Sequence, residues 1–202
     1  SWDGRIYAKH FAEATEPLQR HLRRQSDDTR ARAALGLSLF SLQKFADVRQ
    51  ALKPIEAEVN SDPGLAYAYA VSLVKTGEYS DGVKRLRELE SSNTHSAEIH
   101  TLLGEAFADQ GEWGSALEEY RKALALEPQQ VRAHFLAGLA LIHEGQPSEA
   151  AAGMRAVLQV DPSNLSAKYQ LAFALIQMEQ KQEALVLLRE VLLADPKFSD
   201  AY

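Results

Sequence analysis

The chain has 202 residues, a formal net charge of −6 and no cysteine. The absence of cysteine excludes disulfides, thiolate nucleophiles and cysteine-based zinc sites. The acidic balance disfavours a polyanionic partner, so we expect no nucleic acid to bind. No apolar run reaches the roughly 18 residues that a membrane helix needs, so we expect no direct membrane insertion.

One pattern of small residues, turns and helix stops recurs along the chain every 34 residues. Small residues recur at Gly36, Ala70, Gly104, Gly138 and Ala172. Turn glycines follow at Gly77, Gly111 and Gly145, and prolines that follow an acid lie at Pro128, Pro162 and Pro196. Such self-similarity predicts a stack of like units, because no single unit buries its apolar face alone.

In chain order, residues 1–28 read as the back part of one unit or as an N-terminal helical cap. A cluster of arginines begins in this segment, and we interpret it as a solvated helix end rather than as a contact for an acidic partner or a nucleic acid. Its members are Arg20, Arg23, Arg24, Arg30 and Arg32. Complete units are predicted at 29–62, 63–96, 97–130, 131–164 and 165–198, and residues 199–202 start another. Because the register is unbroken, including at the loop-like residues 91–94, we expect one solenoid domain. Both ends fall within a unit, which favours a fragment of a longer array over ends covered by self-association.

Each unit reads as two helices. In the unit 97–130, apolar residues at helical spacing predict helices over 98–110 and 114–126, with Gly111 in the turn and Pro128 ending the second. Ser96 and Asn164 are expected N-caps. Small residues at the helix crossing allow close approach, and the large apolar column, with Tyr120 and Met154, is expected to fill the space between successive pairs.

The stretch Leu103-Gly104-x-x-Phe107, followed by Gly111, Trp113, Ala116, Tyr120, Ala123 and Pro128, resembles the signature of tetratricopeptide repeat (TPR) proteins. The resemblance covers nearly the whole chain, and it is strongest over 97–164. It implies an all-α fold, a right-handed superhelical solenoid of antiparallel helix pairs. It also implies a function in holding other proteins.

In that family the first helices of the repeats line a groove that holds a peptide or a helix. Carried over by position, the resemblance implies a groove that is apolar at both ends and acidic in the middle. Its expected residues are Leu37, Phe40, Tyr67, Val71, Val74, Glu98, Thr101, Glu105, Asp109, Phe135, Leu139, Ile142, Tyr169, Phe173 and Ile176. The basic clamp for a terminal carboxylate is missing, because Ala33, Leu37, Ala68, Glu98 and Leu102 occupy its positions.

No motif for catalysis or phosphate binding is present, so we expect no enzyme, no cofactor and no metal site. His100 and His134 lie one repeat apart and are interpreted as helix-packing residues rather than metal ligands. Glu118 and Glu119 are expected on an outer face rather than as a catalytic carboxylate pair.

The leading hypothesis is a non-catalytic scaffold or adaptor that binds an amphipathic helix or an extended segment, with apolar anchors flanking basic residues. One alternative is the substrate-recruiting arm of a larger enzyme. Another is a self-associating structural array. The compartment stays open between cytoplasm and periplasm, and we expect a soluble protein that is part of a longer one.

Overall fold

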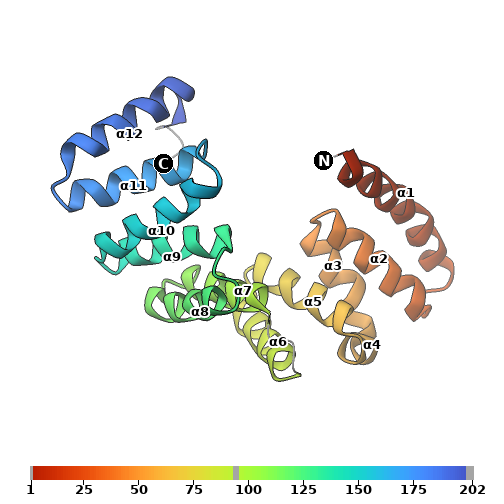
Figure 1. The fold of residues 1–202 in the computed structure, drawn as a ribbon. Coiled ribbons are helices and arrows are strands. Elements are labelled where there is room, and N and C mark those ends of the chain that lie inside the picture. The colour runs from red at the N-terminus through yellow and green to blue at the C-terminus, as the bar shows by residue number, and fades with distance from the viewer. Residues whose placement is uncertain (1, 93–95, 199–202) are drawn as a thin grey trace. The chain divides into compact units, whose positions relative to one another are not determined.

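The computed structural model describes residues 2–92 and 96–198, with side chains from residue 10 onward. Those residues form helices and no strand. The chain divides into two compact units, residues 1–94 and 95–202, and each is described by itself (Figure 1). The sequence predictions for residues 93, 94 and 199–202 lie outside the described residues, and the single-domain organisation stays a prediction.

The first unit is a row of helices in which each contacts the next. They are α1 (Trp2–Arg24), α2 (Thr29–Ser41), α3 (Phe45–Leu52), the short 3₁₀ helix η1 (Lys53–Ile55), α4 (Glu56–Ser61), α5 (Pro63–Lys75) and α6 (Tyr79–Ser91). Contacts run from α1 to α2, from α2 to α3, from α3 to α5 and from α5 to α6. Pro54 lies in η1 and interrupts the second helix of its repeat, because proline lacks the N–H group that an α-helix needs.

The second unit consists of three helix pairs. They are α7 (Ala97–Ala108) with α8 (Trp113–Leu126), α9 (Val131–His143) with α10 (Pro147–Val160), and α11 (Leu165–Gln177) with α12 (Lys181–Ala194). Each helix also contacts the one after it, so the second helix of one pair packs on the first helix of the next. One core of buried residues, Tyr120, Met154 and Leu175 among them, runs through all three pairs.

Each of five turns between paired helices contains one residue in the left-handed conformation. Gly77, Gly111 and Gly145 have φ of +83°, +78° and +69°, and the equivalent residues Gln43 and Glu179 have φ of +57° and +60°. The N–H group of Glu112 donates to the Phe107 carbonyl at 2.9 Å, and the other four turns have the same bond. This is the Schellman ending, in which a left-handed residue closes the helix. The sequence pattern identified only the three glycines.

The small residues of the first helices lie under large side chains of the same pair. A Cβ atom built at Gly104 would lie 2.4 Å from Tyr120 Cε1, and one at Gly138 would lie 2.6 Å from Met154 Cε. The expectation that this large column fills the space between successive pairs is therefore wrong in part. Tyr120 and Met154 fill the space within their own pairs, because glycine leaves room there for a whole side chain.

Side chains cap the N-termini of several helices, but one of the two expected caps is missing. The Asn164 side chain accepts a hydrogen bond from Ala167 N at 2.9 Å, as predicted, and Asp28 and Asp62 cap α2 and α5 in the same way. Ser96 occupies the N-cap position of α7, but its side chain makes no capping bond. The prediction for Ser96 was therefore wrong at the level of the side chain.

Candidate partner-binding surface

The first helices of the second unit lie next to one another, since α7 contacts α9 and α9 contacts α11. Six predicted groove residues occupy equivalent positions on α9 and α11, and we name them the apolar stripe: Phe135, Leu139, Ile142, Tyr169, Phe173 and Ile176. Phe173 and Ile176 are each 43% exposed, and the other four side chains are half-buried. Apolar side chains thus reach solvent on adjacent helices.

The predicted acidic residues lie beside the apolar stripe on α7 and its C-terminal end, and one of them is exposed. Glu98 and Glu105 are half-buried, whereas Asp109 is exposed. Arg132 of α9 donates to Glu98 Oε1 at 2.8 Å and also to Glu105 Oε1. The acidic centre therefore contains a cation that the sequence analysis missed. The sequence did carry a signal for this ion pair, because Arg132 lies one repeat after Glu98. Adjacent first helices place such positions side by side.

Tyr120 is buried close to these charges. Its hydroxyl has no hydrogen-bond partner in the described part of the chain. Burial raises the pKa of Tyr120 well above its usual value, and the carboxylates of Glu105 and Asp109 add to the effect, while Arg132 opposes it. The Tyr120 side chain therefore stays a neutral packing residue next to the acidic centre.

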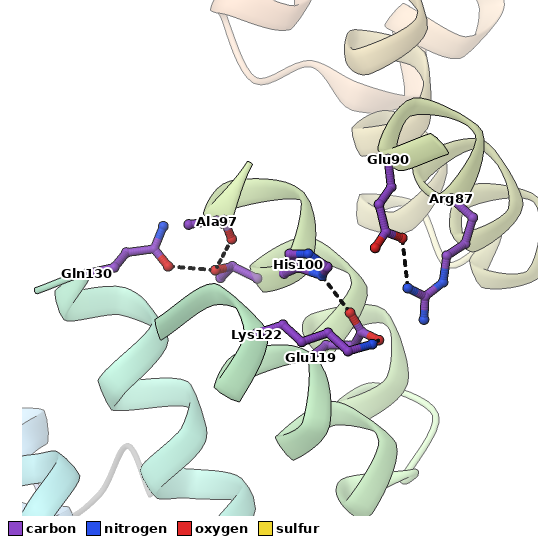
Figure 2. A network of polar contacts seen from close by, with 8 residues as sticks. Arg87, Glu90, Ala97, His100, Glu119, Lys122 and Gln130 are labelled. Carbon is purple, nitrogen blue, oxygen red and sulfur yellow. Dashed lines mark hydrogen bonds and ion pairs between the residues drawn. The ribbon is translucent and has the colours of Figure 1, made fainter. Parts of the chain in front are cut away.

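Thr101 was expected to line the groove, but it is fully buried. Its hydroxyl lies 2.8 Å from the Ala97 carbonyl oxygen and 2.7 Å from the Gln130 side-chain oxygen. Figure 2 shows Ala97 and Gln130 converging on this point from α7 and from the start of α9. Thr101 thus joins two repeats and offers no surface to a ligand.

A buried polar cluster lies between α7 and α8. His100 Nδ1 and Glu119 Oε2 are 2.8 Å apart, and Lys122 Nζ donates to Glu119 Oε1 at 2.9 Å (Figure 2). Glu119 is only 2% exposed, so its predicted place on an outer face was wrong. The reason is that His100 and Lys122 provide the hydrogen bonds that a buried carboxylate requires. The equivalent His134 instead contacts the Pro128 carbonyl oxygen at 2.8 Å.

The first unit holds the other five predicted groove residues. Leu37 is exposed, and the half-buried Phe40 ring packs edge-on against Tyr67, with centroids 6.0 Å apart. Val71 and Val74 are buried, so they contribute to the core and not to a ligand surface. The five predicted groove residues of this unit are therefore an aromatic pair, one exposed leucine and two core valines.

Among the described residues, no group of three or more His, Cys, Asp or Glu side chains is placed to hold a metal ion. None of the described helices is both long and apolar enough to cross a membrane. The chemistry of the described surface is that of ion pairs, aromatic rings and aliphatic side chains.

Comparison with known families gives two matches, both within the C-terminal half. Residues 104–145 match a TPR repeat model, and residues 141–202 match a second tetratricopeptide repeat model. No curated protein sequence matches the chain. The two matches together cover residues 104–202, and they identify that part of the chain as tetratricopeptide repeats.

Several solved structures share the fold. A crystal structure of MamA protein is 20% identical, with a TM-score of 0.70 over 85% of this chain and 94% of that chain. A structure titled "MamA MSR-1 C2" has a TM-score of 0.72 at 20% identity, covering 84% and 97%. YrrB, described as a TPR protein with an unusual peptide-binding site, is 18% identical, with a TM-score of 0.69 over 90% and 94%.

Proposed function

We propose that this chain is a non-catalytic scaffold that binds a peptide or an amphipathic helix of a partner protein on the first helices of its second unit. Apolar anchors of the partner pack on the apolar stripe, and a basic residue of the partner meets Glu105 and Asp109 on the α7 side. The observation that carries the proposal is the exposure of Phe173 and Ile176 beside the half-buried residues of α9.

Three further points support this function. Large apolar side chains that are exposed together mark an interaction surface more often than isolated ones do. Phe173 and Ile176 are also spaced i and i+3, so they lie on one face of α11 and present a continuous contact. YrrB, with the same fold, is described as having a peptide-binding site, which fits a peptide-sized partner.

The test is a selection of random dodecamer peptides on the full chain, followed by affinity titration of the winners. We expect the selected peptides to combine basic residues with large apolar residues. We also expect the double variant Phe173→Ser and Ile176→Ser to bind them at least about tenfold more weakly, because it removes two anchors. Both side chains are partly exposed, so the variant should still fold, and a melting curve checks this.

The matched control is Val160→Ser, which removes an apolar side chain that is 64% exposed on the second helix α10. Its affinity should equal that of the wild type. Equal binding by the double variant and the wild type would place the site elsewhere and refute the proposal. Winners that are acidic rather than basic would refute the role of the α7 carboxylates.

A second candidate is self-association through α12. Leu185 and Leu192 are 48% and 46% exposed, whereas the equivalent Ala151 is fully buried and Leu158 is half-buried on α10, which contacts α11. Light scattering over a range of concentrations tests this candidate. A particle whose mass rises with concentration, and stays monomeric after Leu185→Gln and Leu192→Gln, supports it; a monomer throughout refutes it.

The remaining alternative, a substrate-recruiting arm of a larger enzyme, stays a prediction. It requires a catalytic domain in the same open reading frame, so the sequence of the full-length gene product decides it.

A further inference from the structure

A cavity of about 410 Å³ lies in the first unit among α1, α2 and α3. Its apolar lining comes from Leu22 of α1 and from Leu35 and Leu39 of α2. Its charged lining is Arg23, Arg32 and Asp47. The volume falls within the range of about 300–1,000 Å³ that is typical of ligand pockets. None of these residues belongs to the predicted groove.

The arginine cluster supplies the charge at this cavity. Arg20 is held by Glu16 at 2.5 Å, and Arg32 Nε donates to the Ser26 carbonyl oxygen at 2.8 Å. Within the described part of the chain, the side chains of Arg23, Arg24 and Arg30 make no hydrogen bond or ion pair, although the Arg30 backbone N–H group donates to Asp28. Of these three, Arg23 lines the cavity, and an arginine beside leucine side chains suits an anion that is attached to an apolar group.

The acidic side chains nearby are largely committed to other contacts. Asp28 accepts a hydrogen bond from Ala31 N at 2.9 Å and lies 2.8 Å from His21 Nε2, and Asp27 accepts from the Ser26 hydroxyl at 2.5 Å. Asp47 is the carboxylate that remains in the cavity lining. The cavity lining itself holds two arginines, Arg23 and Arg32, against this one carboxylate, so its formal charge is positive although the whole chain is acidic.

The equivalent place one repeat later offers a comparison within the same unit. There Tyr69 and Arg85 replace Leu35 and Ala51, and the Arg85 guanidinium lies over the Tyr69 ring at 5.1 Å. Arg85 is also bound by Glu56 at 2.5 Å, and Arg49 by Glu78 at 3.0 Å. A second cavity lies there, and its arginines Arg49 and Arg85 are paired within the chain, whereas Arg23 is left for a partner.

We propose that the cavity among α1, α2 and α3 is a docking site for an acidic segment of a partner protein that carries one large apolar side chain. The apolar side chain enters over Leu22, Leu35 and Leu39, and the flanking carboxylates bind Arg23 and Arg32. The described residues that line the cavity include no aromatic side chain on which a base could stack, which favours an acidic peptide over single-stranded nucleic acid.

The probe is a labelled peptide of four glutamates around one central phenylalanine, titrated by fluorescence anisotropy against the full chain at low salt. We expect saturable binding that weakens as salt rises, since the contact is partly ionic. Replacing the phenylalanine with serine should weaken binding by about tenfold or more, because the apolar anchor is lost. A failure of the phenylalanine peptide to bind at millimolar concentration would overturn the proposal.

Two charge reversals on α1 locate the site. Arg23→Glu should weaken binding by about tenfold or more, whereas Arg20→Glu, three residues earlier and outside the cavity lining, should weaken it by less than about threefold. Both side chains are exposed, so folding should persist. Equal losses of affinity in both variants would show that binding depends only on the net charge of α1, which would overturn the proposal.

Two further measurements separate this site from other readings. The variant Phe173→Ser with Ile176→Ser should bind the acidic peptide as the wild type does, because its changes lie in the other unit. A single-stranded oligonucleotide of equal charge should bind more weakly than the phenylalanine peptide. Tighter binding of the oligonucleotide that is lost in Arg23→Glu would assign the site to nucleic acid instead.

Discussion

Tyr120 of α8 packs over Gly104 of α7 so closely that no side chain fits between them. A Cβ atom at residue 104 would lie 2.4 Å, 2.6 Å and 2.9 Å from three atoms of the Tyr120 ring. Because Tyr120 is only 1% exposed and the core surrounds it, the ring has no room to retreat. The pairing of α7 with α8 therefore depends on glycine at this crossing.

The variant Gly104→Ala should lower the free energy of unfolding by about 1–3 kcal/mol, because overpacking forces the ring or the backbone to shift. Urea denaturation measures the change. Gly114→Ala is the matched control, since it lies in α8 with nothing within 4 Å of an added Cβ. The control should raise the free energy of unfolding by up to about 1 kcal/mol, since alanine favours a helix over glycine. Equal effects of the two changes would refute the close-contact argument.

The left-handed turns allow a reciprocal test. Gly111→Ala, at φ of +78°, should cost about 1 kcal/mol, since a side chain disfavours this conformation. Glu179→Gly, at φ of +60°, removes the same strain and should raise the free energy of unfolding by up to about 1 kcal/mol. Thermal denaturation of both variants measures the pair. A loss of stability in Glu179→Gly would show that its backbone is not strained.

The unpaired hydroxyl of Tyr120 predicts a stability that depends on pH. Burial raises the pKa of Tyr120, so the folded state keeps its proton while an unfolded tyrosine ionises above about pH 10. Wild-type stability should be complete below that pH and fall above it, by up to about 1.4 kcal/mol per pH unit from this group. Tyr120→Phe should remove that part of the slope. It should also be neutral or stabilising at pH 7, because no hydrogen bond is lost. Parallel slopes for the two proteins would contradict the prediction.

The neighbouring glutamates Glu118 and Glu119 differ in their environment. Glu119→Gln should lower the free energy of unfolding by about 1–3 kcal/mol, since it weakens the hydrogen bonds of a buried carboxylate to His100 and Lys122. Glu118→Gln, at an exposed position, should change it by less than about 0.5 kcal/mol. Guanidinium denaturation at pH 7 compares them. Similar losses at both positions would contradict the buried-cluster argument.

The ion pairs of Arg132 with Glu98 and Glu105 should weaken the binding of a basic peptide to these carboxylates. Arg132→Gln should change stability by less than about 1 kcal/mol, because its pairs with Glu98 and Glu105 are partly exposed. It should tighten binding of a basic-apolar peptide, most clearly at low salt, since the carboxylates lose a competing charge. Arg121→Gln, which removes the Arg121–Glu149 pair of the second helices, should leave peptide affinity unchanged. Weaker binding in Arg132→Gln would mean that Arg132 itself contacts the peptide.

The period of 34 predicted the helix pairs well because each pair depends mostly on local signals. Turn glycines such as Gly77 and Gly111 end helices through backbone conformation, and the capping side chain of Asn164 acts within three residues. Gln43 and Glu179 were missed because a left-handed residue that is not glycine has no compositional signal. The fold class and its repeat spacing are thus readable without coordinates.

The candidate surface was less predictable, since exposure depends on the neighbouring helix. The same repeat position is buried at Val71 and exposed at Phe173, and adjacent glutamates became one solvated residue and one buried residue, Glu119. Position in a repeat says which face of a helix a residue occupies, but not what covers that face.

The amino-acid sequence by itself determined the repeat length, the helix pairs, their turns and the family resemblance, because these follow from spacing and backbone preference along the chain. Only the tertiary structure decided that Arg132 joins Glu98 and Glu105, that Glu119 is buried with His100, and that Arg23 borders a cavity. The physical reason is that charge pairing and desolvation depend on distances between side chains of different helices, and packing sets those distances.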